Sequence, residues 1–269
     1  MATAAPAASP ALPAGPADTL RAGGTAVWWW PIPGRAHPAD TALLPASERE
    51  RAERFGSRAR VAEYVTSRAA VRRTLAGLVG VEPPAVELGR LRCPCCGDPG
   101  HGPPTILSPS VPWWIGISHT AGLGLLAVSG APVGVDVERM RSIPAEDLSS
   151  AVLTSSEREF VLSVPPGEGR VAAFLRVWTR KEATLKAVGT GISSDLTALE
   201  THPRRTGTAE VTAGVPGGDP RTWHVTDLPL PGPWSAATAV ARREGGAGPV
   251  RLYAAAARST AGPVRRGGA

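Results

Sequence analysis

Both lysines of this 269-residue chain lie in one short segment, WTRKEATLK, which runs from Trp178 to Lys186. Arginine occupies every other basic Lys/Arg position, and lysine differs from it in being a compact, mobile point charge rather than a planar fork. Glu182 and Lys186 are four residues apart and would therefore lie on one face of a helix. The segment predicts either a carboxylate and an ammonium that act together or a surface ion pair, which contributes only a few tenths of a kcal/mol.

A second acidic pattern lies upstream, in the sequence VGVDVE of residues 133–138. Side chains of a strand alternate between two faces, so the three valines would share one face, and Gly134, Asp136 and Glu138 the other. Two carboxylates about 7 Å apart on one face repel each other unless a cation neutralises them. Oxygen ligands without a neighbouring His or Cys favour Mg²⁺. The alternative is an edge strand with a solvated acidic face and Arg139 as its partner.

The lysine-containing segment would add a third carboxylate to this strand. Asp136, Glu138 and Glu182 would together form an oxygen-only site with room for water and phosphate oxygens, as Mg²⁺ usually binds beside a nucleotide. Lys186 would then contact the same phosphates. These residues predict a magnesium-dependent reaction at a phosphate group.

The tripeptide from Ser118 to Thr120 places His119 between two hydroxyl groups at the end of an expected strand. A single histidine is usually packed or hydrogen-bonded, but here it could bind a phosphate. The sequence has no glycine-rich phosphate loop of the Walker or Rossmann kind. No serine lies in a nucleophile elbow either, so a Ser-His-Asp hydrolase is excluded.

Apolar periodicity and turn residues predict the elements that must position these groups. Helices are expected after Ser47 as N-cap, over 61–79, over 156–162 with Ser155 as cap, and over 171–188, where Gly189 would end the helix. Strands are expected over 26–30, 86–91, 114–118, 123–128, 133–137, 222–226, 234–241 and 250–254. The strands 114–118 and 123–128 would form a hairpin. Each half of the chain is thus expected to be a small antiparallel sheet packed with helices, which is an α+β fold.

The expected division of the chain has four parts. Residues 1–24 form a disordered Ala/Pro-rich tail, 25–130 an N-terminal subdomain, 131–257 a C-terminal subdomain with the acidic motifs, and 258–269 a basic tail. Residues 1–24 lack the basic start and unbroken apolar stretch of a signal peptide. No segment of the sequence approaches the length of a membrane span.

Composition limits the classes of partner. With 42% apolar and 19% charged residues, the chain is typical of a soluble globular protein. A net charge of +6 and a pI near 10.0 favour acidic partners such as phosphates or acidic proteins. Basic and aromatic residues do not interleave in a stripe, so nucleic-acid binding is not expected.

The three cysteines, Cys93, Cys95 and Cys96, are crowded into one loop. An odd number of cysteines in one cluster is not a disulfide framework and indicates a reducing cytoplasm. A zinc site needs four ligands, and only His101 is close enough in sequence to complete one. The sequence therefore favours a Pro/Gly loop that happens to hold cysteines over a metal site, and it leaves the role of this loop open.

Three segments, in this order, resemble the Sfp-type 4′-phosphopantetheinyl transferases: ISHT at 117–120, VGVDVE at 133–138 and FLRVWTRKEATLKAVG at 174–189. The last two are signature motifs of that family, and the resemblance spans residues 25–257. It implies a pseudo-twofold pair of similar α+β subdomains with coenzyme A in the cleft between them. The expected boundary at residues 130–132 agrees with this arrangement.

The resemblance also implies roles for the acidic residues and the second lysine. Asp136, Glu138 and Glu182 would be the Mg²⁺ ligands. Glu182 would also be the base, acting directly or through water, that activates a serine of the carrier protein. Lys186 would contact the pyrophosphate of coenzyme A and so belong both to the catalytic and to the binding residues.

The remaining implied contacts concern the phosphates of coenzyme A. Ser118 and His119 would hold them, with His119 at the 3′-phosphate, and Arg51 would supply a further basic contact at that end. The family commonly has a basic residue in a Gly-Lys-Pro-like turn before the Ser-His strand. Here that turn spans Gly102–Pro104, so Pro103 replaces the charge, which would have to come from an arginine elsewhere.

The expected activity is Mg²⁺-dependent transfer of 4′-phosphopantetheine from coenzyme A to a serine of an apo acyl or peptidyl carrier protein, with release of adenosine 3′,5′-bisphosphate. The expected protein is a cytoplasmic monomer. The alternative is a non-catalytic module of the same fold that binds coenzyme A or a carrier protein. Fatty-acid, polyketide and nonribosomal peptide pathways all remain open, as does tolerance for acyl-coenzyme A donors.

Overall fold

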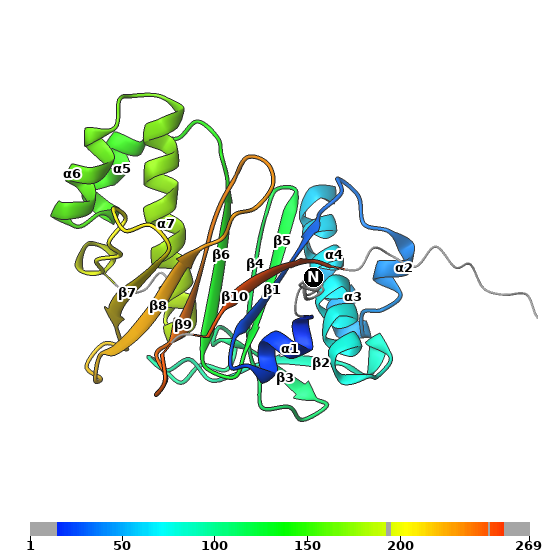
Figure 1. The fold of residues 1–269 in the computed structure, drawn as a ribbon. Helices are drawn as coiled ribbons and strands as arrows, with labels where there is room; N and C mark the ends of the chain where they lie inside the picture. The colour runs from blue at the N-terminus through cyan, green and yellow to red at the C-terminus, as the bar shows by residue number, and fades with distance from the viewer. Residues whose placement is uncertain (1–14, 192–194, 247, 256–269) are drawn as a thin grey trace, which may run out of the picture.

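The computed structural model describes residues 15–191, 195–246 and 248–255, and it consists of two similar halves that meet at the centre of the molecule (Figure 1). The first half contains α1 (Pro16–Arg21), β1 (Thr25–Pro31), α2 (Pro38–Thr41), α3 (Ala46–Glu53), α4 (Arg58–Val79), β2 (Glu87–Arg90), β3 (Pro104–Ser108), β4 (Trp114–Thr120) and β5 (Leu123–Ser129). The second contains β6 (Val133–Arg139), α5 (Ala145–Val152), α6 (Ser155–Ser163), α7 (Glu168–Val188), β7 (Thr208–Ala213), β8 (Arg221–Asp227) and β9 (Trp234–Ala241). The final strand β10 (Val250–Ala254) returns to the sheet of the first half.

Two four-stranded sheets, in the orders β10-β1-β5-β4 and β6-β9-β8-β7, form the framework, and β2 and β3 make a separate hairpin. Helices α2–α4 lie on the outer side of the first sheet and α5–α7 on the outer side of the second (Figure 1). The predicted α+β class is confirmed. Neighbouring strands within the two large sheets are antiparallel except for β1 and β10, which pair in parallel.

The main predicted elements are present, with differences at their ends. The hairpin of β4 and β5 forms as expected, and α4 begins at Arg58, with Ser57 as its cap, three residues before the predicted start at residue 61. Two predicted caps are wrong: Pro45 precedes α3, so Ser47 lies inside it, and Thr154 caps α6. Thr154 forms a reciprocal capping box with Glu157, which a cap at Ser155 could not form because the acidic residue must lie three positions ahead. The patterns did not indicate α5, β3 or β7.

Strand β1 shows how the first sheet is buried on both faces. Ala26, Trp28 and Trp30 pack into a core with residues of α4, whereas Val27 packs into a second core with valines of β6. Alternation of side chains across a strand produces this division. The first sheet is therefore covered by its own helix on one side and by the second half of the molecule on the other.

The second half is organised by a very close approach of α7 to β6. A Cβ atom at Gly134 would lie 2.1 Å from the carbonyl oxygen of Ala183 and 2.5 Å from the amide nitrogen of Ala187. No side chain fits in that space, so the helix backbone rests directly on the strand. The strand face that carries Gly134 and Asp136 thus looks onto α7, as the period of two predicted.

The same strand also contacts the first half. A Cβ atom at Gly116 of β4 would lie 3.2 Å from the Cα of Gly134, so β4 and β6 approach closely although they belong to different sheets. Two glycines thus allow three backbones, those of β4, β6 and α7, to come together.

Buried ion pairs hold the opposite side of α7. The ammonium of Lys181, which is fully buried, lies 2.6 Å from a carboxylate oxygen of Glu157 and donates to the carbonyl oxygens of Leu196 and Leu199. Arg180, also fully buried, donates to Asp227 through Nε at 2.7 Å and Nη2 at 2.8 Å. Removing one partner of such a pair leaves a buried charge unpaired, which is strongly destabilising. Lys181 is therefore a structural residue.

The ends of the described chain meet in the first sheet. Residues 15–24 were expected to be disordered, but α1 forms there and Thr19 shares a 2.7 Å hydrogen bond with Tyr253 of β10. Residues 1–14 and the expected basic tail at 258–269 lie outside the described residues. The division at residue 130 remains a prediction, and the last strand of the expected C-terminal part pairs with β1. Within the described ranges, no helix has the length and apolar character needed to cross a membrane.

The contact at Gly134 yields a stability prediction. Gly134→Ala should lower the free energy of unfolding by about 3 kcal/mol, because the added methyl group meets helix backbone rather than a movable side chain. Chemical denaturation with urea measures this difference.

Gly77→Ala is the matched control. Gly77 is exposed within α4 and has nothing within 4 Å of an added Cβ, so alanine there should stabilise the protein by about 1 kcal/mol. Equal unfolding free energies for Gly134→Ala and the unmodified protein would contradict the proposed contact.

Candidate functional site

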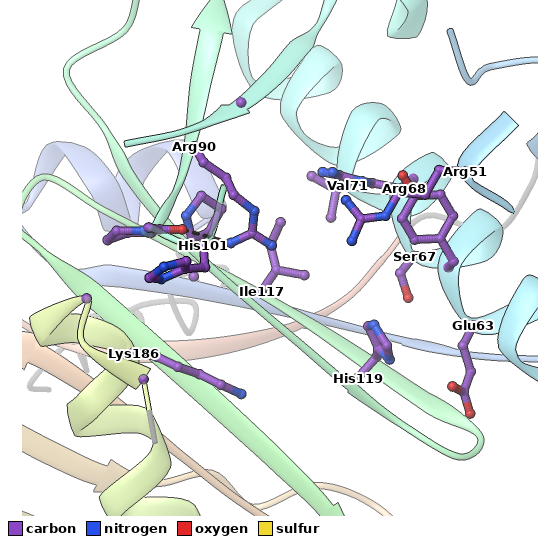
Figure 2. Close-up of a pocket in the computed structure, with 18 of the residues that line it drawn as sticks. Arg51, Glu63, Ser67, Arg68, Val71, Arg90, His101, Ile117, His119 and Lys186 are labelled. Carbon is purple, nitrogen blue, oxygen red and sulfur yellow. Dashed lines mark hydrogen bonds between the residues drawn. The ribbon is translucent and has the colours of Figure 1, made fainter. Parts of the chain in front are cut away.

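A cavity of about 490 Å³ opens between α4, β4, the hairpin of β2 and β3, and the C-terminal end of α7. Its volume is within the range usual for small-molecule sites. Figure 2 shows Lys186 and His119 on one side of it, with Arg90 and Arg68 across from them. The polar and charged lining residues are Arg51, Arg60, Glu63, Tyr64, Ser67, Arg68, Arg90, His101, His119 and Lys186.

This cavity is strongly cationic. Burial lowers the pKa of Arg90, and the positive charges of Arg68 and Arg51 lower it further. The guanidinium groups of Arg51 and Arg68 both lie 5.6 Å from the ring of Tyr64, which groups them on the α4 side. Several cations that disfavour one another's charge would be stabilised by an anion placed among them. The cavity is suited to a ligand with several negative charges.

The predicted phosphate-binding residues are divided between the two faces of β4. His119 faces the cavity (Figure 2), and burial is the main cause that lowers its pKa. Ser118 points the other way, is buried, and donates a 2.9 Å hydrogen bond to Oδ1 of Asp136. Arg51 and Lys186 line the same cavity as His119. The structure therefore brings three of the four predicted residues to one cavity and places Ser118 against the acidic strand.

Lys186 connects the cavity with the carboxylates. Its ammonium group lies 2.5 Å from Oδ1 of Asp136 and donates to Ser118 Oγ at 3.1 Å. A third of its side chain surface is exposed, so it can still reach a ligand. The alternative of an isolated surface pair between Glu182 and Lys186 does not describe this helix, because Glu182 is only 7% exposed and Lys186 bonds across to β6 and β4.

The three predicted metal ligands lie in one electrostatic neighbourhood. Burial raises the pKa of Glu182, and the charges of Asp136 and Glu138 raise it further while Lys186 opposes them. Burial likewise raises the pKa of Glu138, with Asp136 as the next cause. Mutual repulsion of this kind is what a divalent cation relieves.

The donor atoms themselves also fit a cation. Oδ2 of Asp136 and Oε1 of Glu182 are buried and have no hydrogen-bond partner within the described part of the chain. Buried polar atoms are normally paired, so two buried carboxylate oxygens without a hydrogen-bond partner are suited to bind a cation. The oxygens of Asp136, Glu138 and Glu182 do not all lie within 4.8 Å of one another. Final ligand geometry would therefore require side-chain adjustment.

An aromatic pair on α7 lies beside Glu138. The indole of Trp178 lowers the pKa of Glu138 slightly, against the larger effect of burial, and its ring stacks on Phe174 with centroids 6.5 Å apart. Trp178 lies one helical turn before Glu182, as the sequence indicated. The helix thus supplies one carboxylate and places an indole beside a second, which comes from the strand.

Three cationic residues of the cavity were missed by sequence reasoning: Arg60, Arg68 and Arg90. Arg60, Tyr64 and Arg68 are spaced by four residues, which places them on one face of α4, so a signal existed. Because arginine is abundant throughout the chain, residue type alone does not single out these positions. Arg90 also donates a 2.7 Å hydrogen bond to the carbonyl oxygen of Gly102, next to the turn in which Pro103 replaces the expected basic residue.

Comparison with known proteins identifies the family of this chain. A model of the 4′-phosphopantetheinyl transferase superfamily matches residues 132–239. A putative 4′-phosphopantetheinyl transferase of Synechocystis is 27% identical over 206 residues, which cover 76% of this chain and 79% of the relative. The transferase HetI of Nostoc is 31% identical over 181 residues, 62% of this chain and 70% of the relative, and psf-1 of Bacillus pumilus is 33% identical over 101 residues, 37% and 42% respectively. This chain belongs to the 4′-phosphopantetheinyl transferase superfamily.

Proposed function

We propose that this transferase moves the 4′-phosphopantetheine group of coenzyme A onto a serine hydroxyl of an apo carrier protein, with Mg²⁺ as cofactor. The observation that carries this proposal is the position of Lys186, which lines a cationic cavity and bonds a buried carboxylate of β6. A polyanion in the cavity would have its pyrophosphate at this junction. The cavity volume and the surplus of arginines suit coenzyme A.

Asp136, Glu138 and Glu182 would hold the Mg²⁺ ion. When bound, the ion neutralises negative charge on the pyrophosphate oxygens. The orphaned oxygens of Asp136 and Glu182 and the raised pKa values of Glu138 and Glu182 support this ligand set.

The reaction forms a bond between the serine oxygen and the phosphorus next to the pantetheine arm, and it breaks the bridging bond of the pyrophosphate. Glu182 takes the serine proton, directly or through a water molecule. Lys186 stays near the bridging oxygen and stabilises the charge that develops on the leaving adenosine 3′,5′-bisphosphate. Ser118, which donates to Asp136 and accepts from Lys186, holds these two groups in position.

The other end of coenzyme A would occupy the arginine-lined part of the cavity. Arg51 and His119 would contact the 3′-phosphate. Arg68 and Arg90 would supply the positive charge that a basic residue at position 103 usually provides in the family. One chain provides both walls of the cavity, which agrees with a monomer. The net charge of +6 favours encounter with an acidic carrier protein, and we propose a cytoplasmic location because coenzyme A and carrier proteins are found there.

Removing the proposed base should stop transfer. Glu182→Gln should lower the rate at least about 100-fold, since the amide cannot accept the serine proton, and Asp136→Ala should abolish transfer through loss of a metal ligand. Mass spectrometry of an apo carrier protein incubated with enzyme, coenzyme A and Mg²⁺ measures the gain of phosphopantetheine.

Glu159→Gln, an exposed position on α6, is the matched control and should retain full activity. Circular dichroism should show that each variant is folded. If the mass of the carrier protein does not change with the unmodified enzyme, the non-catalytic binding module is favoured. Full turnover by Glu182→Gln would refute the role of Glu182 as base.

Magnesium binding can be tested without the reaction. Mg²⁺ should raise the Tm of the unmodified protein in the absence of coenzyme A, because a ligand that binds only the native state stabilises it. Glu138→Gln should weaken this response, whereas Asp147→Asn, an exposed acid on α5, should preserve it. A Tm that is independent of Mg²⁺, or equal responses of the two variants, would count against the ligand set.

The cationic end of the cavity predicts a discrimination between two donors. Arg51→Ala should raise the KM for coenzyme A about tenfold, as expected for loss of one charge-assisted hydrogen bond. It should change little for dephospho-coenzyme A, which lacks the 3′-phosphate. Arg54→Ala, at the end of the same helix but outside the cavity lining, is the control. Equal effects on both donors would remove Arg51 from the 3′-phosphate contact.

A further inference from the structure

The loop between β2 and β3 gathers three metal-binding side chains that play no part in the proposed reaction. The thiol sulfurs of Cys93 and Cys96 and a ring nitrogen of His101 all lie within 4.8 Å of one another. The spacing of two residues between the cysteines is the usual one for two ligands contributed by one turn. This grouping goes beyond the proposed transfer reaction and does not depend on it.

One distance in this group agrees closely with a shared metal ion. Sγ of Cys96 and Nε2 of His101 are 3.5 Å apart. Tetrahedral zinc with Zn–S of about 2.3 Å and Zn–N of about 2.0–2.1 Å separates a sulfur and a nitrogen ligand by about 3.5 Å. The two side chains therefore already have the separation that a zinc ion would impose.

The backbone of the loop turns tightly at the first cysteine, whose side chain is buried. The amide of Gly97 donates to the carbonyl oxygen of Cys93 at 2.8 Å, with Gly97 in the left-handed region at φ 74°. This tight turn brings the buried sulfur of Cys93 within 4.8 Å of the ligand atoms of Cys96 and His101.

Backbone hydrogen bonds also hold this turn against the residues that form the cavity wall. Leu91 and Cys93 donate backbone hydrogen bonds to Pro103 and Asp98, at 2.8 and 2.9 Å. A Cβ atom at Gly102 would lie 1.9 Å from the carbonyl oxygen of Leu91, so the two strands of the loop touch at that glycine. His101 itself lines the cavity beside Arg90 (Figure 2).

We propose that Cys93, Cys96 and His101 bind a zinc ion that fixes the loop forming one wall of the cationic cavity. The three cysteines are free in the structure, and the convergence of two of them with an imidazole favours a metal over a disulfide. Zinc is favoured among divalent ions because the donors are sulfur and nitrogen. The fourth position of a tetrahedral zinc ion would fall to Asp98, whose Oδ2 lies 3.5 Å from Nε2 of His101, or to water. The role of the ion would be structural, because its ligands face one another rather than the carboxylates near Lys186.

Cysteine 95 provides a matched control within the same turn. Its side chain is exposed, and its sulfur is not part of the group whose ligand atoms converge. The His101 side chain is 59% exposed and Cys96 is exposed, so replacing either should leave the fold intact. Differences in metal content between Cys95 and Cys96 variants then report on ligation rather than on folding.

The test uses the full chain purified under reducing conditions. Elemental analysis should find one zinc ion per chain in the unmodified protein and in Cys95→Ser, and loss of most of it in Cys96→Ser and His101→Ala. Replacement of zinc by Co²⁺ should produce the thiolate-to-metal charge-transfer band and the intense visible bands of a tetrahedral site in the first two proteins only. Circular dichroism should show all four proteins folded.

Two results would overturn the assignment. One is an unmodified protein that neither retains zinc nor develops the Co²⁺ bands, including one whose cysteines form a disulfide instead. The other is equal metal binding by Cys95→Ser and Cys96→Ser. Metal content is measured without coenzyme A or a carrier protein. These outcomes can therefore be interpreted even if the transferase assay fails.

Discussion

The arrangement of the site depends on the contact between the backbone of α7 and the strand β6 at Gly134. Because no side chain separates them, the helix cannot slide or rotate without a clash, and the positions of Glu182 and Lys186 relative to Asp136 are fixed. Backbone atoms of Ala183, Lys186 and Ala187 form the helix side of the contact. A strand with any side chain at position 134 would hold the helix farther away and separate the ammonium of Lys186 from its 2.5 Å contact with Asp136.

The basic residues between Trp178 and Lys186 have two different roles, which their burial distinguishes. Arg180 and Lys181 are fully buried and bonded to Asp227 and Glu157 on the side of α7 away from the cavity. Lys186 is partly exposed and bridges β4, β6 and the cavity. Ion pairs on one side of the helix and the backbone contact on the other hold it in a fixed position. Such rigidity suits a site whose carboxylates repel one another.

Local periodicity was sufficient to predict much of this site. The alternation in VGVDVE predicted that Gly134 and Asp136 share one face of a strand. The four-residue spacing predicted that Glu182 and Lys186 share one face of a helix. Properties set by distant segments were not predictable: the bond of Ser118 to Asp136, and the position of Arg90 beside Gly102, depend on how separate strands meet. The abundance of arginine obscured the role of the α4 face, since a common residue carries little information by type alone. The family motifs indicated the α+β fold, which the structure confirms.

The parallel pairing of β10 with β1 has a consequence for how the molecule unfolds. The chain leaves the first sheet after β5, builds the whole second sheet, and returns to form the outer edge of the first. The first sheet is therefore built from segments on both sides of the second sheet in the sequence. A fragment that ends at β5 therefore lacks the edge strand of its own sheet, and denaturation should proceed as one cooperative transition. A fragment that stops after β9 would leave the free edge of β1, with its three consecutive tryptophans, open to pairing between molecules and hence to aggregation.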